Sequence, residues 1–182
     1  MVDVVIHDPS GTPADVTSDG HLRVASIVET QLEHVSAEDG LSFGWSSTFA
    51  TGGTDLEVLS LQNDASDLFL HLDQVWLAAA AAATFSLNRM TSGTPAGTII
   101  TGRPLNFDRL KTAEATAFGN ASVTGSVAGD LIAHILVPAS QSVLVDLEGA
   151  WVLGKNDVFF LGCATNTTIF ATVIGHYDEE GG

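Results

Sequence analysis

The chain has 182 residues, of which 45% are hydrophobic and 15% charged, a composition typical of a folded domain rather than a disordered chain. Acidic residues outnumber basic ones by 22 to 6, and the formal net charge of −16 disfavours binding to nucleic acid or to anionic lipid. The single Cys163 excludes an internal disulfide, and no secretion signal is evident, so we expect synthesis in the cytoplasm. No run approaches the ~20 apolar residues that span a bilayer, so we expect no membrane passage.

Residues 1–34 are predicted to form a short N-terminal β arm. Val2, Val4 and Ile6 alternate with other residues in a strand-like segment that ends at an Asp-Pro-Ser-Gly turn. A second turn, Ser-Asp-Gly at residues 18–20, is followed by another alternating segment. The pattern therefore predicts strand and hairpin in the arm. An apolar strand so far from the domain is expected to pair with a neighbouring chain, either another subunit or the surface to which the protein binds.

Residues 35–182 contain longer apolar runs separated by turns rich in Gly, Asn and Asp. Eight strands are predicted, at residues 41–49, 56–61, 68–77, 84–90, 131–138, 142–147, 157–163 and 168–177. Strands at this spacing predict an all-β fold, a jelly-roll-like antiparallel β-sandwich.

Six consecutive alanines at residues 78–83 interrupt this pattern. Alanine has the highest helix propensity of all residues, so a short helix is one interpretation. The segments on either side alternate apolar and polar residues, which favours strand, loop and strand.

The polar segment 101–127 is too long for an ordinary connection and predicts a functional or interface loop. Four of the six basic residues lie in it or just before it: Arg89, Arg103, Arg109 and Lys111. In so acidic a chain, this clustering indicates contact with an acidic neighbour, and a solvated loop that happens to carry charge is the alternative.

Residues 149–156 match the spacing of a phosphate-binding P-loop until Asn156, which stands where a Ser or Thr should hold magnesium. The interior of the segment, around Trp151, is strand-like rather than flexible. We therefore predict a hairpin turning at residues 154–157, with Gly154 and Asn156 in turn conformations that β-branched residues cannot adopt.

No other pattern predicts a catalytic, cofactor-binding or metal-binding residue. The six histidines show no zinc-ligand spacing, His71 and His134 are predicted on sheet faces, and Cys163 lies in an apolar strand where a thiol is inert. Acidic residues are scattered, although a pair of distant carboxylates for glycoside hydrolysis or an Asp-rich calcium turn stays possible.

The three tryptophans, Trp45, Trp76 and Trp151, lie in apolar runs. They are predicted in the core or in subunit contacts rather than on a sugar-binding platform, for which exposed aromatic residues on loops would be expected.

Residues 142–177 resemble the closing strands of jelly-roll domains in tailed-phage head decoration, cement and head-fibre proteins. The shared features are a strand leading to a Leu-Gly-x-x-Asp turn at residues 153–157, an apolar strand, an Asn/Thr turn, and a last strand ending Gly175-His176-Tyr177. The stretches 102–107 and 115–120 resemble the long loop of these domains, and residues 17–24 are similar to short hairpins of phage structural proteins.

This resemblance implies a non-enzymatic virion protein on the capsid surface, a decoration or cement protein that binds and stabilises the head shell. It implies a homo-oligomer, most simply a trimer, that contacts the major capsid protein or neighbouring virion proteins. The predicted interface residues are Val2, Val4, Ile6, Arg103, Arg109 and Lys111. The alternative function is a carbohydrate- or receptor-binding module of a phage tail or fibre.

Overall fold

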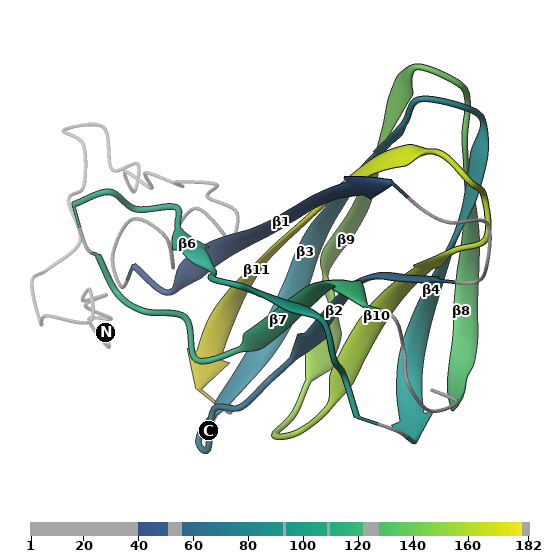
Figure 1. The fold of residues 1–182 in the computed structure, drawn as a ribbon. Helices are drawn as coiled ribbons and strands as arrows, with labels where there is room; N and C mark the ends of the chain where they lie inside the picture. The colour runs from purple at the N-terminus through teal and green to yellow at the C-terminus, as the bar shows by residue number, and fades with distance from the viewer. Residues whose placement is uncertain (1–39, 51–55, 93, 109, 122–127, 180–182) are drawn as a thin grey trace, which may run out of the picture. The chain divides into compact units, whose positions relative to one another are not determined.

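The structure is a computed structural model that describes residues 40–179, except 51–55, 93, 109 and 122–127 (Figure 1). The predicted N-terminal arm, residues 1–34, lies outside the described residues.

Eleven strands make up the secondary structure of the described part of the chain, which contains no helix and hence none that could cross a membrane. They are β1 (Ser42–Ala50), β2 (Leu56–Gln62), β3 (Leu68–Ala79), β4 (Ala83–Ser92), β5 (Thr98–Ile100), β6 (Arg103–Pro104), β7 (Thr116–Ala121), β8 (Ala128–Val137), β9 (Gln141–Leu153), β10 (Val158–Cys163) and β11 (Thr168–Glu179).

The strands form two antiparallel sheets that pack as a sandwich, which confirms the predicted all-β sandwich (Figure 1). The five-stranded sheet has the order β6-β1-β11-β3-β9, and the six-stranded sheet has the order β5-β7-β2-β10-β4-β8.

The core lies between the sheets and follows the two-residue period of the strands. In β11, Ile169, Ala171 and Val173 are buried, whereas Phe170 between them is exposed. The largest fully buried side chains are Trp45, Tyr177, Phe43, Phe85 and Phe159.

The alanine run is strand, loop and strand, as its flanks predict. β3 ends at Ala79 and β4 begins at Ala83, and both of these side chains are buried in the core. Tertiary packing of small apolar residues therefore overrides helix propensity here.

The predicted uninterrupted loop at residues 101–127 was wrong, because β6 and β7 lie within it and β5 immediately precedes it. β7 pairs with β2 and β5 and buries Ala117. β5 and β6 have only three and two residues, and β7 contains Gly119 and Asn120, which are uncommon in strands, so the strand signal of this region is weak.

The predicted end of β9 at residue 147 was also wrong, because the strand continues to Leu153. Glu148 and Gly149 have left-handed φ values of 49° and 69°, and the register with β3 shifts beside them. The glycine that suggested a strand end belongs to a β-bulge.

The predicted hairpin at residues 154–157 was wrong in topology. A tight turn is present, with the Asp157 backbone N–H donating to the Gly154 carbonyl over 3.0 Å, but it joins β9 of one sheet to β10 of the other. Asn156 has the expected left-handed φ, 64°, whereas Gly154 does not have a positive φ.

Candidate functional site

Two of the predicted interface residues lie on the surface near β6. Arg103 opens β6 and Lys111 follows in the connection to β7, and both side chains are exposed. Arg109, Val2, Val4 and Ile6 lie outside the described residues. The structure therefore places part of the predicted interface in one exposed segment of chain.

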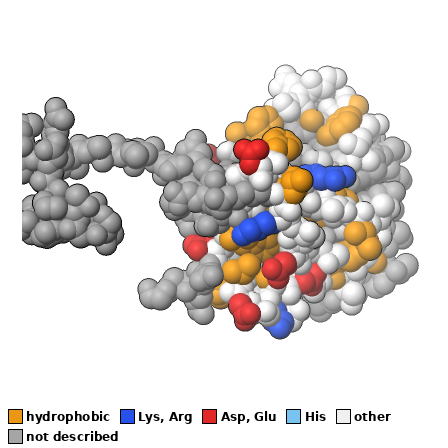
Figure 2. All heavy atoms as spheres, turned by 90° about the vertical axis from the view of Figure 1, so that its left-hand side faces the viewer, with side chains coloured by type: hydrophobic (Ala, Val, Ile, Leu, Met, Phe, Trp, Pro, Cys, Tyr) orange, Lys and Arg blue, Asp and Glu red, His pale blue; other side chains and the backbone are white. Residues whose placement is uncertain are grey.

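Large apolar side chains stand out from this same segment. Phe107 is 85% exposed and Leu110 is 77% exposed, and Leu105 is partly exposed between them and β6. We call residues 103–111 the β6 loop. Figure 2 views the side of the molecule that carries β6 and shows hydrophobic side chains next to Lys and Arg side chains, with Asp and Glu side chains also on this face. Apolar side chains and charges of both signs thus lie on this surface.

Backbone hydrogen bonds fix the start of the β6 loop. Arg103 pairs with Gly44 of β1, and the Leu105 N–H donates to the Ser42 carbonyl over 2.9 Å. The Asn106 side chain then accepts the Asp108 N–H over 2.9 Å, an Asx turn that holds the tip of the loop. Phe107 is presented by an ordered turn.

Core contacts fix the two flanks of the loop. A Cβ at Gly102 would lie 2.6 Å from Nε1 of Trp45, so only glycine fits against the indole at this point. Where the chain returns, the Tyr177 hydroxyl accepts the Ala115 N–H over 2.5 Å. Burial raises the pKa of Tyr177 far above its usual value, so this phenol stays neutral.

A second polar cluster lies inside the five-stranded sheet, where β3 bulges at Asp73 against both of its neighbours. His176 Nδ1 donates to the Asp73 carboxylate over 2.9 Å. The His71 ring stacks on His176 with centroids 5.0 Å apart, and His71 Nδ1 donates to the Gly149 carbonyl over 3.2 Å.

An imidazole oriented by a carboxylate is the arrangement of a general base, but this one is closed to reactants. His176 is 1% exposed, and among the described residues its Nε2 has no hydrogen-bond partner. No group of three His, Cys, Asp or Glu side chains in the described chain could hold a metal ion. The cluster links β3 and β11 at the double bulge.

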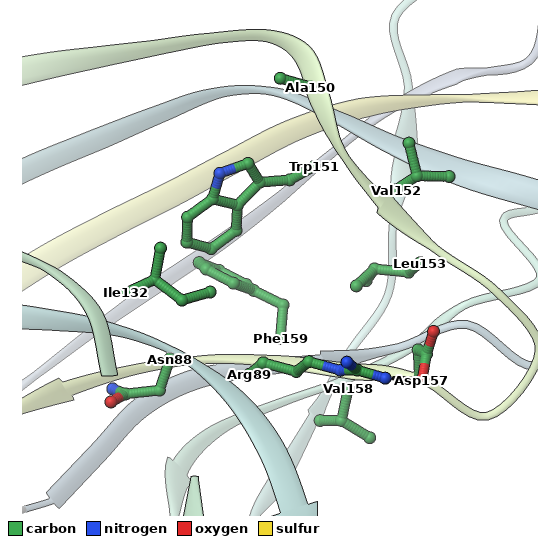
Figure 3. A pocket seen from close by; sticks show the side chains of 10 residues that line it. All are labelled: Asn88, Arg89, Ile132, Ala150, Trp151, Val152, Leu153, Asp157, Val158 and Phe159. Atoms are coloured by element: carbon green, nitrogen blue, oxygen red, sulfur yellow. Dashed lines mark hydrogen bonds and ion pairs between the residues drawn. The ribbon is translucent and has the colours of Figure 1, made fainter. Parts of the chain in front are cut away.

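A cleft of about 310 Å³ opens between the two sheets beside the end of β9, lined by aromatic and aliphatic side chains together with Asn88, Arg89 and Asp157. Figure 3 shows Trp151 and Phe159 at its base, with Ile132 pointing into the same space and Arg89 close to Asp157. The Trp151 and Phe159 rings meet edge to face with centroids 5.5 Å apart, and the Arg89–Asp157 ion pair measures 3.4 Å.

The P-loop-like segment forms one wall of this cleft rather than a phosphate cradle. Residues 149–153 belong to β9 and residues 158–163 to β10, so neither the flexible loop nor the following helix of a P-loop is present. The spacing of the glycines was coincidental.

The tryptophans divide into three environments. Trp45 is fully buried, as predicted, and Trp151 is partly buried against the core. Trp76 is 45% exposed on the outer face of the five-stranded sheet. Of its two predicted places, the core is therefore excluded and the subunit contact stays a prediction.

A scan of protein-family models, a search of curated proteins and a search of solved structures each found no match to this chain.

Proposed function

We propose that the chain is a non-enzymatic structural subunit of the virion decoration or cement type. It associates as a homo-oligomer, with a trimer favoured, and binds the major capsid protein or neighbouring virion proteins through the β6 loop. The observation that carries this proposal is the exposure of Phe107 and Leu110 between basic residues of a chain with net charge −16.

Exposed aromatic and aliphatic side chains of this size are typical of binding surfaces, because burying them in a partner removes apolar area from water. Aromatic residues and cations are also the groups that contribute most to protein interfaces. Arg103 and Lys111 would pair with acidic groups of the partner and reduce the repulsion between acidic subunits. The β6 loop thus provides both the apolar and the electrostatic contributions to binding.

The strand order supports the jelly-roll expectation. Without β5, β6 and β7, the sheets are β1-β11-β3-β9 and β2-β10-β4-β8. Every remaining sequential connection except the long one, β4 to β8, then passes from one sheet directly to the other. This crossing is what a double-sheet jelly roll requires. Together with the resemblance of residues 142–177, it favours the virion interpretation.

The role follows from mass action. A protein that binds assembled shell subunits but not separate ones stabilises the assembled state in proportion to its own affinity and concentration. Such a subunit needs a binding surface and no reactive group, which agrees with the closed Asp73–His176 cluster.

The test is binding of the purified protein to heads that lack it, followed by sedimentation and electron microscopy. The double variant Phe107→Ser/Leu110→Ser should keep its melting temperature, because both side chains are exposed, but should lose at least tenfold in affinity. Leu136→Ser is the matched control, since Leu136 is 68% exposed on β8, and it should bind normally. Equal binding by the double variant and the wild type would overturn the proposal.

A second candidate, a carbohydrate- or receptor-binding module, has its own support. Phe170 pairs with Ala78, two positions from Trp76 along β3, so the two exposed aromatic rings are diagonal neighbours on the outer sheet face. A hollow of about 320 Å³ beside them is lined by alanines, Ser140, Gln141, Ser142 and Phe170, an uncharged mixture of apolar and hydroxyl or amide groups suited to a neutral sugar. Glycan-array binding that Trp76→Ala abolishes and Phe107→Ser leaves intact would favour this function.

A further inference from the structure

The sandwich is open along one side. β8 and β9 are the last strands of their sheets, and in the described part of the chain neither has a partner on its outer edge. The two strands are joined at residues 138–140, but β9 ends beside β10, so they diverge from their common turn (Figure 1). Both free edges carry unpaired backbone donors and acceptors, which are sites for strand addition.

The cleft beside the end of β9 lies where the strands diverge. β9 contributes residues 150–153 to it, and β8 contributes Ile132. Ile132 is skipped by the ladder, because Leu87 pairs with Ala133 and Asn88 pairs with Leu131. The side chain is 51% exposed and points toward Trp151 and Phe159 (Figure 3). The apolar side chains accessible in this opening therefore include Ile132 and the partly buried Trp151, whereas Phe159 beneath them is 1% exposed.

We propose that residues 2–6 of a second copy of this chain add to the free edge of β9 and fill the cleft. Val2, Val4 and Ile6 recur every second residue, so in a strand they share one face and would all point at Trp151 and Phe159. This inference rests on the proposed association of copies and names the surface that receives the arm.

Length and charge agree with this occupant. The docking edge is short: the bulge at Glu148 and Gly149 separates residues 150–153 from the rest of β9. A strand of five residues, about 17 Å long, is enough to cover it. The rim of the cleft carries Arg89, whose side chain is 61% exposed despite its ion pair, and Asp8 lies two residues after the segment that would fill the cleft. The arm thus offers a carboxylate of opposite charge beside the docking segment.

The connection is long enough to reach a neighbour. The chain from residue 7 to residue 41 can extend up to about 110 Å at about 3.3 Å per residue, whereas a domain of this size is roughly 30–40 Å across. The connection is therefore long enough for each copy in a ring to place its arm on the next copy.

Cysteine cross-linking of the full-length chain tests this placement. The inward-facing residues of the added strand would be Val2, Val4 and Ile6, so Asp3 and Val5 would lie on the outer face with Val152. Protein with Val5→Cys is mixed with size-tagged protein that carries Val152→Cys, and the mixture is oxidised mildly. Asp3→Cys is tested in parallel, because it would lie opposite Val152 if the added strand were shifted by two residues. Cross-strand Cβ atoms about 4.5–5.5 Å apart form disulfides readily after small shifts.

We expect a disulfide between the two differently sized copies. The control pairs the same arm variant with Thr48→Cys, an exposed position on β1 of the same sheet, and should give at least tenfold less product. Yields no higher than this control would overturn the inference. A disulfide that forms within one chain of a doubly substituted protein, but not between copies, would also overturn it.

Hydrogen exchange gives a second readout. In the wild type, edge amides within residues 150–153 should exchange more slowly by at least tenfold than in Val4→Asp, which places a charge in the cleft. Equal protection in the two proteins would contradict strand addition. The two proposals can fail separately. If the β6-loop variant loses head binding but the arm forms no cross-link, only this inference is wrong. If the arm cross-links between copies but the protein does not bind heads, only the proposed function is wrong.

Discussion

Truncating the three tryptophans one at a time should give three distinct losses of stability. Trp45 is fully buried, and removing about 200 Å² of buried apolar surface at about 25 cal/mol per Å² gives an upper bound of about 5 kcal/mol. Measured losses for truncating buried aromatic residues, which include the cavity left behind, are about 3–5 kcal/mol, and we expect Trp45→Ala to fall in this range.

Trp151 packs on Phe159 but lines an open cleft, so water replaces the lost ring and no closed cavity forms. Trp151→Ala should therefore cost about 2–3 kcal/mol. Trp76 is 45% exposed, and Trp76→Ala should cost about 1–2 kcal/mol.

Urea unfolding followed by far-UV circular dichroism measures all three variants, because it does not depend on tryptophan fluorescence. A Trp76→Ala loss as large as that of Trp45→Ala would refute the assignment of inner and outer faces. Unchanged stability of Trp151→Ala would refute its contact with the core.

Three further predictions concern the supports of the two sites. Gly102→Ala should lower the free energy of unfolding by about 1–3 kcal/mol, because the new Cβ would lie 2.6 Å from Nε1 of Trp45. Gly154→Ala should change it by less than about 0.5 kcal/mol, because the nearest atom to its Cβ, Oδ2 of Asp157, would be 3.4 Å away. Tyr177 is the single tyrosine, and its raised pKa means that the native state keeps its proton where the unfolded state loses it. Stability should thus be full below about pH 10 and fall at higher pH, with phenolate absorbance at 295 nm appearing together with unfolding; phenolate in folded protein near pH 10 would contradict this. A double-mutant cycle of Asp73→Asn and His176→Phe should give a coupling energy of at least about 1 kcal/mol, and additive effects would show that their hydrogen bond contributes nothing.

Alternation along the chain was enough to predict the strands that face the core. In β11, the period of Ile169, Ala171 and Val173 is visible in the sequence, and all eight predicted strands are found. The sheet that each strand joins was not predictable, because a turn such as Gly154 to Asp157 has the same composition whether it links neighbours in one sheet or crosses the sandwich.

The candidate site was predictable in part. Clustered basic residues pointed to the β6 loop, but the exposure of Phe107 depends on an Asx turn and on the pairing of β6 with β1. Apolar residues inside an otherwise polar segment were the available signal. The Asp73–His176 pair spans 103 positions, and only the double bulge brings the two side chains together.

Sedimentation equilibrium of the full-length protein tests the central claim, that this chain acts by assembling. We expect a mass that is a multiple of 18.9 kDa, most simply three copies, at micromolar concentration, and attachment of that oligomer to heads that lack it. A protein that stays monomeric at every accessible concentration and does not sediment with such heads would contradict the account.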